Sequence, residues 1–281
     1  MLIMGERGAA AMENEARKRE SARLYGALET AVNGSMARLF NALEQLQNEL
    51  EKSGNDELLE RAQGLLEVIR DCSLEQGRLT MSLGESMLCQ SGKLVAQEMS
   101  MDVSGHLEQM TEMARPYAER KGCTLEFVSD GELVTVVDPT LMDRMVLNLI
   151  SNALWHGREN GHILVQLHRE GSGGCLSVTD DGFGIPKERQ EHLTELFGDW
   201  DERFPGGTGL YLVKEFCDRM NWTLEWESGP QGTRFAVHIP PVAPQDILRM
   251  NSSSGYRMDE EVLRSRVRME MLGSLNGEHK N

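Results

Sequence analysis

Residues from about 10 to 98 contain no proline, and their apolar residues recur three or four positions apart. A first series runs through Leu28, Val32, Met36, Leu39, Leu43, Leu46 and Leu50, and a second through Leu58, Ala62, Leu65, Ile69, Cys72, Leu79, Leu83 and Met87. This spacing is typical of the seam along which helices pack in coiled coils and bundles. The sequence Lys-Ser-Gly-Asn-Asp at residues 52–56 interrupts it, as expected of a turn between helices. Residues 1–100 are therefore predicted to form a helical hairpin.

The two apolar series are too long for one hairpin to bury by itself. Pairing with a second copy would enclose both in a four-helix bundle, so we expect a homodimer through the hairpin. The alternative is a long hairpin that lies against the rest of the chain. Four methionines at and after the end of the hairpin, at positions 99, 101, 110 and 113, are read as part of helix packing.

Residues 101–241 change to a mixture of strands and helices. Alternating apolar residues predict strands at 124–130, 132–137, 162–170, 175–180, 222–229 and 232–240. Helical spacing predicts helices at 104–122, 139–157, 187–197 and 209–220. Because strands and helices do not alternate regularly, the expected fold class is α+β, with an α/β sandwich after the helical hairpin. Residues 242–281 are read as a loosely attached C-terminal tail, which could form one short helix.

Composition and charge indicate the cellular compartment of the protein and exclude some classes of partner. The 281 residues carry a formal net charge of −16 without a Lys/Arg cluster, which argues against nucleic acid as a partner. No apolar run approaches the length of a membrane span, and the N-terminus lacks the apolar core of a signal peptide. The five cysteines have no metal-ligand spacing, so they are expected to be reduced and mostly buried. These features predict a cytoplasmic protein without membrane insertion.

Four polar or glycine-rich motifs follow one another in the second half of the chain. Asn148 and Asn152 lie four residues apart, so both amides share one helix face, and an amide oxygen suits Mg²⁺. The strand ending at Asp180 runs into Asp-x-Gly-x-Gly, where glycine allows a ligand to approach and a carboxylate can accept from its amine. The glycine-rich loop at 205–214 opens a helix whose first amides can cradle phosphate. A glycine turn at 229–235 leads into the final strand.

In this order the motifs resemble the ATP-binding domain shared by sensor histidine kinases, gyrase-type ATPases and Hsp90, and they are most similar to the histidine kinases. The sequence DPTLMDRMVLNLISNALWHG resembles their N box, DDGFGIP their first glycine box and GGTGL their second. GTRFAVHIP resembles the closing strand, and ARPYAERKG resembles the helix that begins the domain. The hairpin stands where these kinases place their dimerisation and histidine phosphotransfer domain. The resemblance implies a protein of two-component signalling that binds Mg²⁺ with ATP or ADP.

For the adenine end of the nucleotide, the resemblance implies four residues. Asp180 would accept a hydrogen bond from the exocyclic amine of adenine. Gly182 and Gly184 would let the turn close against the base, and Thr233 would support the pocket beside Asp180.

For the phosphate end, the resemblance implies a metal ligand and a loop. Asn152 would ligate Mg²⁺, with Asn148 lining the same site. The residues of the glycine-rich loop under the phosphates would be Gly207, Thr208, Gly209 and Leu210. Residues 198–206 would form a short lid that closes over the nucleotide.

The hairpin departs from the family because it contains no histidine. Family members carry a phosphoacceptor histidine on the first helix, and the matching position here holds Gly34 or Met36, depending on the alignment. The first histidine is His106, placed in the linker after the second helix and without the usual acidic neighbour. A phosphohistidine needs an imidazole nitrogen as nucleophile, so standard autophosphorylation on this hairpin is not expected.

Two further departures concern the nucleotide site. Trp155 stands where the family usually has a phosphate-contacting lysine, for which Arg158 or Lys187 could compensate. Asn148 stands where the gyrase-type relatives have a glutamate general base. An amide cannot take a proton from water, so rapid ATP hydrolysis is not expected.

Two functions stay open at this point. A kinase of the histidine kinase class would phosphorylate a partner in trans, such as the hairpin histidine of another histidine kinase. A pseudokinase would bind nucleotide and regulate a partner kinase or a response regulator without catalysis. A serine kinase of the anti-sigma type is a weaker third reading, because those kinases lack a long hairpin.

Overall fold

The computed structural model describes residues 38–48, 50–52, 56–196, 208–251 and 259–275. The chain divides into two compact units between Leu94 and Val95. The expected histidine position, Gly34 or Met36, and the lid at 198–206 lie outside the described residues. All five cysteines are free thiols, and four of them are buried. No helix in the described part is long and apolar enough to cross a membrane.

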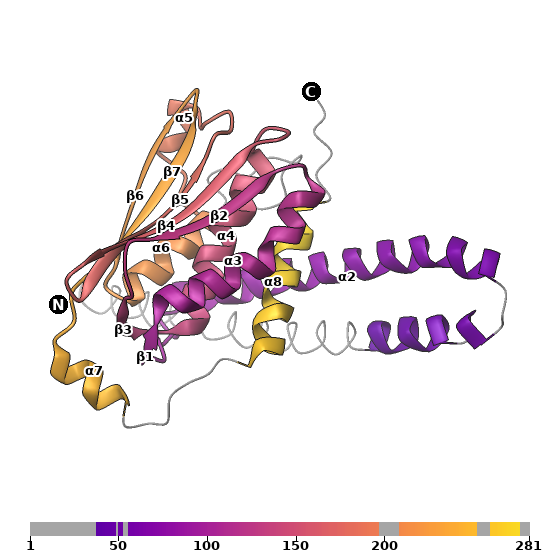
Figure 1. The fold of residues 1–281 in the computed structure, drawn as a ribbon, viewed down its shortest axis with the longest axis horizontal. Coiled ribbons are helices and arrows are strands. Elements are labelled where there is room, and N and C mark those ends of the chain that lie inside the picture. Colours follow the sequence, from indigo (N-terminus) through magenta and orange to yellow (C-terminus); the bar gives the residue numbers. More distant parts are fainter. Residues whose placement is uncertain (1–37, 49, 53–55, 197–207, 252–258, 276–281) are drawn as a thin grey trace, which may run out of the picture. The chain divides into compact units, whose positions relative to one another are not determined.

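The first unit is helical in its described part, as the apolar spacing predicts. Helical backbone covers residues 38–48 and 50–52, and the long helix α2 spans Asp56–Gln90. The two stretches run in opposite directions (Figure 1). Leu43 and Leu66 are buried, whereas Leu46 is 51% and Leu65 is 68% exposed. A single chain therefore leaves apolar surface of this hairpin uncovered.

The second unit contains a five-stranded sheet in the order β2-β4-β5-β7-β6. Its strands are β2 (Thr124–Ser129), β4 (His162–Glu170), β5 (Gly173–Asp180), β6 (Thr223–Gly229) and β7 (Gly232–Ile239). β2 pairs with β4 in parallel, and the other neighbours are antiparallel. A mixed sheet with a helical layer confirms the predicted α+β class.

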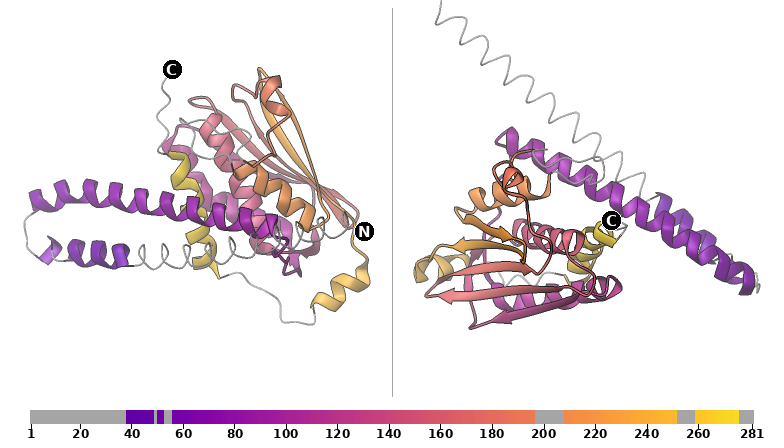
Figure 2. Two further views of the ribbon diagram at one scale, coloured as in Figure 1. Left: turned by 180° about the vertical axis from the view of Figure 1, so that it is seen from behind. Right: turned by 90° about the horizontal axis from the view of Figure 1, so that it is seen from above.

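Helices cover one face of this sheet (Figures 1 and 2). They are α3 (Val103–Arg120), α4 (Pro139–His156) and α6 (Gly209–Arg219). Ile163, Val165 and Leu167 of β4 are buried in the core, which is why their alternation predicted a strand. α4 begins where the Asp138 carboxylate accepts from the backbone N–H of Thr140, at 2.8 Å.

Two segments differ from the prediction. Residues Met99–Asp102 form strand β1, which is antiparallel to β3 (Val134–Val137). Met99 and Met101 therefore belong to a two-stranded sheet and not to helix packing, because pairing with a distant strand sets their conformation. The helix predicted at 187–197 is limited to α5 (Lys187–Gln190), followed by turns up to residue 196.

The C-terminal region is more tightly packed than the sequence predicted. It forms α7 (Pro244–Asn251) and α8 (Glu260–Leu275). α8 packs against α3 and α4 and buries Leu263, Val267 and Met271. These residues lie four apart, so one stripe of the helix faces the domain. The reading of residues 242–281 as a loosely attached tail is therefore wrong for α8.

Candidate functional site

The amide side chains of α4 face the start of α6. Asn148 is 3% exposed, and its Nδ2 donates a hydrogen bond to the carbonyl oxygen of Arg144 at 2.7 Å. A Cβ added at Gly209 would lie 3.0 Å from the Asn148 Oδ1 and 4.0 Å from the Asn152 Oδ1. The lack of a side chain at Gly209 thus leaves room beside two amide oxygens at the first turn of α6.

The start of α6 brings backbone donors to these amides. Thr208 precedes the helix, is buried, and forms no side-chain capping bond. Leu210 follows Gly209 in the first turn and is half-buried. The first N–H groups of a helix carry a partial positive charge that favours an anion. The structure therefore brings together the residues predicted for phosphate and Mg²⁺, except Gly207, which lies outside the described residues.

Asp180 ends β5 opposite Thr233 of β7. Its Oδ1 accepts a hydrogen bond from the backbone N–H of Gly182 at 2.9 Å. Burial raises the pKa of Asp180, backbone hydrogen bonds from Gly182 and Thr233 oppose that shift, and the charge of Asp181 adds to it. The Thr233 hydroxyl in turn shares a hydrogen bond with the Ser228 hydroxyl at 2.8 Å. A donor on a ligand would stabilise a carboxylate whose ionised form is disfavoured in this way.

The two glycines after Asp180 are required by neighbouring backbone. Gly184 has a φ of +71°, and a Cβ there would lie 1.9 Å from the carbonyl oxygen of Gly229. A Cβ at Gly182 would lie 2.9 Å from the carbonyl oxygen of His156, at the end of α4. Close packing of the protein on itself thus requires both glycines, and their place against a base stays a prediction.

α4 carries both parts of the site. Its middle holds Asn148 and Asn152 beside α6, and its last residue, His156, meets the turn after Asp180. At a rise of 1.5 Å per residue, Asn152 is about 8 Å along the helix axis from Gly157, the residue that follows His156 at the end of α4. The amide pair and the Asp180 carboxylate therefore bound one region from two ends.

Trp155 and Arg158 have protein partners that the sequence did not predict. The Lys121 ammonium lies 5.3 Å from the centre of the Trp155 ring and 3.4 Å from the carbonyl oxygen of Leu154. Burial lowers the pKa of Lys121. Arg158 donates to the carbonyl oxygen of Pro230 at 2.9 Å and lies 5.2 Å from the Phe183 ring centre. Arg158 is thus bonded at the adenine side of the site, while Lys121 brings a cation to the end of α4.

The donor set of the site fits Mg²⁺ bound together with phosphate. Among the described residues, no group of three or more His, Cys, Asp or Glu side chains could hold a metal ion. Mg²⁺ usually keeps several waters and binds one or two protein oxygens plus substrate phosphates. The amide oxygens of Asn148 and Asn152 are ligands of this kind, and Gly209 leaves space beside them.

The residues of this site lie in a segment of the chain that matches a known ATPase family. Residues 137–243 match the family described as histidine kinase-, DNA gyrase B- and HSP90-like ATPase. The chain carries a domain of this family. The ATPase domain includes α4, both glycine motifs and the closing strand, so every predicted site residue lies within it. The resemblance inferred from the motifs is confirmed.

Curated proteins similar to this chain include sensor kinases. The chain is 29% identical over 180 residues to the alginate biosynthesis sensor protein KinB of Pseudomonas aeruginosa, covering 62% of this chain and 30% of that protein. It is 27% identical over 227 residues to sporulation kinase B of Bacillus subtilis, covering 76% of this chain and 47% of that protein. The chain therefore spans less than half the length of these two relatives.

Solved structures share the fold. Full-length ShkA, crystallised in complex with AMPPNP, is 20% identical with a TM-score of 0.55, covering 71% of this chain and 45% of that one. The Acinetobacter baumannii histidine kinase AdeS is 17% identical with a TM-score of 0.50, covering 73% of this chain and 96% of that one. At these identities the likeness concerns the arrangement of the backbone.

Proposed function

We propose that this chain is a histidine kinase-like protein of two-component signalling that binds Mg²⁺ with ATP or ADP. The observation that carries the proposal is the convergence of Asn148 and Asn152 on Gly209. Asn152 ligates Mg²⁺, and the first amides of α6 bind phosphate. Asp180 accepts from the adenine amine, supported by Thr233, its partner across the sheet.

The ATPase domain is suited to holding a nucleotide more than to hydrolysing it quickly. Asn148 donates its amide hydrogen to Arg144, and its remaining Oδ1 has no basicity with which to activate water. Bound Mg²⁺ would neutralise phosphate charge and orient the terminal phosphate. Slow turnover lets the nucleotide state persist as a signal.

The missing histidine argues against phosphotransfer to the chain's own hairpin and leaves two modes of action. Residues 1–105 contain no histidine, and His106 is buried in α3 with its Nε2 2.5 Å from Asp143. Phosphotransfer would then occur in trans, onto a histidine that another kinase supplies. Without such a partner, the protein acts as a pseudokinase whose nucleotide state regulates a partner kinase or response regulator, as a homodimer in the cytoplasm.

The test of nucleotide binding is a calorimetric titration of the full chain with ADP, with Mg²⁺ and with a chelator. Asn152→Ala should weaken binding in Mg²⁺ about tenfold or more, which corresponds to about 1.4 kcal/mol. In the chelator its affinity should stay close to that of the unmodified chain. Gln166→Ala removes an exposed amide from β4 and serves as the control. An unmodified chain that binds no adenine nucleotide would refute the proposal.

A second experiment separates the two modes of action. The chain is incubated with labelled ATP, alone and with a candidate histidine kinase whose own ATP-binding site has been inactivated. Label on the partner's histidine identifies transfer in trans. Bound nucleotide without any transferred label identifies the regulatory mode.

A further inference from the structure

α8 lies outside the segment that matches the family. It still belongs to the same compact unit, residues 95–281, which is called the ATPase unit below. The match ends at residue 243, whereas α8 spans Glu260–Leu275. α8 lies across α3 and α4 (Figure 1), and its apolar stripe is buried against them. The chain therefore adds an element that contacts the helix on which Asn148 and Asn152 stand.

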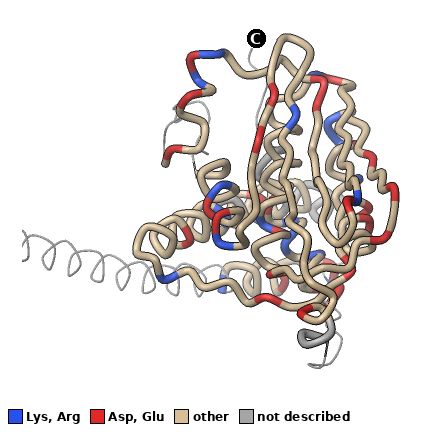
Figure 3. Tube along the Cα trace, turned by 90° about the vertical axis from the view of Figure 1, so that its left-hand side faces the viewer, with Lys and Arg blue, Asp and Glu red and all other residues tan. Residues whose placement is uncertain are grey.

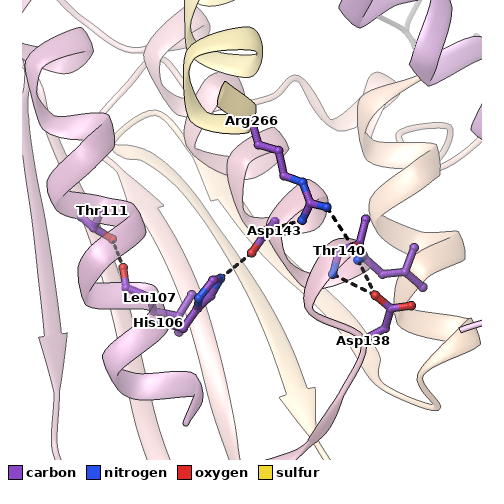
Figure 4. Close-up of polar contacts among 8 residues, drawn as sticks. His106, Leu107, Thr111, Asp138, Thr140, Asp143 and Arg266 are labelled. Carbon is purple, nitrogen blue, oxygen red and sulfur yellow. Dashed lines mark hydrogen bonds and ion pairs between the residues drawn. The ribbon is translucent and has the colours of Figure 1, made fainter. Parts of the chain in front are cut away.

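Charged side chains fix this contact at defined positions. Arg266 of α8 donates to the Asp143 carboxylate at 2.7 Å and to the Thr140 hydroxyl at 3.1 Å (Figure 4). Asp143 is fully buried on α4, and its other oxygen lies 2.5 Å from the His106 Nε2 of α3. Asp143 thus joins three helices through bonds that depend on direction and distance.

A second buried pair lies next to the nucleotide site. Glu270 of α8 lies 3.3 Å from the Arg144 Nε, and both side chains are almost fully buried. The carbonyl oxygen of the same Arg144 accepts the amide hydrogen of Asn148. That bond fixes the orientation of the Asn148 amide and turns its Oδ1 toward Gly209. A continuous series of contacts therefore runs from α8 to the phosphate end of the site.

We propose that α8 is a positioning element of the nucleotide site, and that Arg266 and Glu270 are its positioning residues. This inference rests on the proposed nucleotide binding. Removing one partner of a buried ion pair leaves a charge without compensation, so the backbone of α4 near Asp143 and Arg144 must adjust. The shift reaches Asn148 and the Mg²⁺ ligand Asn152, which lies one turn further along α4.

The adenine end meets α4 at its last residue, His156, about three turns beyond Arg144, and its other contacts come from the sheet. Asp180 is held by Gly182 and faces Thr233, and the turn after it packs on Gly229. Asp180 and Thr233 belong to β5 and β7, Gly182 lies in the turn after β5, and Gly229 ends β6. Loss of the α8 contacts should therefore weaken the phosphate and Mg²⁺ end of binding and spare the adenosine end.

The experiment compares Arg266→Gln and Glu270→Gln with the unmodified full chain. Arg264→Gln is the matched control, because Arg264 is exposed on α8 and pairs with Glu260 of the same helix. Affinities for Mg²⁺-ADP and for adenosine are measured by calorimetry, with thermal unfolding followed in parallel. We expect both variants to bind Mg²⁺-ADP about tenfold more weakly, within the usual range of coupling between sites. Adenosine affinity and the Arg264→Gln variant should be unchanged.

Several results would overturn the inference. Unchanged Mg²⁺-ADP affinity in both variants contradicts it and leaves the proposed function intact. An equal loss of adenosine and Mg²⁺-ADP affinity shows general destabilisation. If Glu270→Gln fails to fold, the result for Arg266→Gln decides alone, since the Arg266 side chain is 24% exposed. If neither variant folds, α8 has only a structural role. An unmodified chain that binds no Mg²⁺-ADP refutes the proposed function itself.

A reciprocal measurement needs no substitution. If α8 favours the binding-competent arrangement of α4, bound Mg²⁺-ADP must favour docked α8 by the same factor. Amide hydrogen exchange in α8 should therefore slow when Mg²⁺-ADP is added and change little with adenosine. Equal exchange rates with and without Mg²⁺-ADP would contradict the inference.

Discussion

Burial makes the ionised form of Asp180 costly to the folded protein. Burial and the charge of Asp181 raise its pKa, so the folded protein holds this proton to a higher pH than the unfolded chain does. As the pH rises above the ordinary value of 3.8, the unfolded chain loses its proton first, and the free energy of unfolding falls until the folded pKa is passed. Ionisation of Asp180 therefore lowers the stability of the folded protein, and a donor on a ligand would offset that loss.

Asp180→Asn should separate stability from binding. The variant removes the disfavoured charge, so its melting temperature should exceed that of the unmodified chain at neutral pH. The difference should shrink as the pH is lowered toward the ordinary pKa. Affinity for Mg²⁺-ADP should fall about 100-fold, because a charged hydrogen bond worth about 1.5–3 kcal/mol is lost and two donors then face each other. Thermal unfolding over a pH series and calorimetry measure the two effects.

Asp218→Asn is the control for this comparison. Asp218 is an exposed carboxylate on α6 that pairs with Lys214. Its substitution should leave nucleotide affinity unchanged. Unchanged affinity in Asp180→Asn would contradict the adenine assignment, and a lower melting temperature at neutral pH would contradict the argument from its pKa.

Gly184→Ala should destabilise the fold directly. The backbone of Gly184 has a φ of +71°, and a Cβ would overlap the carbonyl oxygen of Gly229 at 1.9 Å. Backbone strain alone costs about 1–3 kcal/mol, and relief of the overlap must move one of two turns. Urea unfolding measures the loss. Gly229→Ala, where a Cβ meets nothing within 4 Å, should change stability little; equal stability of the two variants would show that the turns adjust freely.

The sequence predicted some of these residues and missed others for physical reasons. Asp180, Gly182 and Gly184 form one short local motif at the end of a strand, so their chemistry could be read directly. Lys121 lies at the end of α3, and its position over Trp155 depends on packing between segments far apart in the chain. The sequence offered Arg158 or Lys187 as a substitute for the phosphate lysine. Arg158 instead donates to the carbonyl oxygen of Pro230, in the turn between β6 and β7.

At the scale of elements, local signals predicted the long helices better than the short or distant ones. Pro139 and Gly157 bracket α4 as expected, and apolar spacing predicted α2. The four residues of β1 are too few for a reliable period, and the strand exists because it pairs with β3. The packing of α8 depends on Arg266 reaching Asp143, more than a hundred residues earlier in the chain.

Disruption of the exposed apolar stripe on α2 should separate the proposed dimer. Leu65 and Ile69 are four residues apart, and their exposed fractions are 68% and 42% in the single chain. Leu65→Lys with Ile69→Lys would bury charges in a four-helix bundle, so the variant should sediment as a monomer. Gln63→Lys adds charge at an exposed position beside the stripe and is the control.

The dimer prediction has a clear opposing result. An unmodified chain that sediments as a monomer at micromolar concentration would refute it, as would a dimer that survives both lysine substitutions. Because Leu65 and Ile69 are exposed in the single chain, their replacement should leave the helix content measured by circular dichroism unchanged.

At the scale of the whole molecule, the proposed nucleotide site and the helical hairpin belong to different units of the chain. The ATPase domain lies in the unit that begins at Val95, and the hairpin precedes Leu94. Asp and Glu number 45 against 29 Lys and Arg, and Figure 3 shows both kinds scattered along the described chain. This scatter is what we expect of a solvated acidic surface.

Incubated alone with Mg²⁺ and labelled ATP, the chain should form no phosphohistidine on its hairpin. Residues 1–105 offer no imidazole nitrogen. His106 lies near the start of α3, is 8% exposed, and its Nε2 is 2.5 Å from Asp143. To reach the terminal phosphate it would have to leave a buried contact and expose Asp143 and Arg266 to rearrangement. The measurement is acid and base treatment of the labelled protein followed by peptide mapping. Acid-labile label on a peptide containing His106 would show that α3 opens to present it, and the site of phosphotransfer would then lie in the ATPase unit itself.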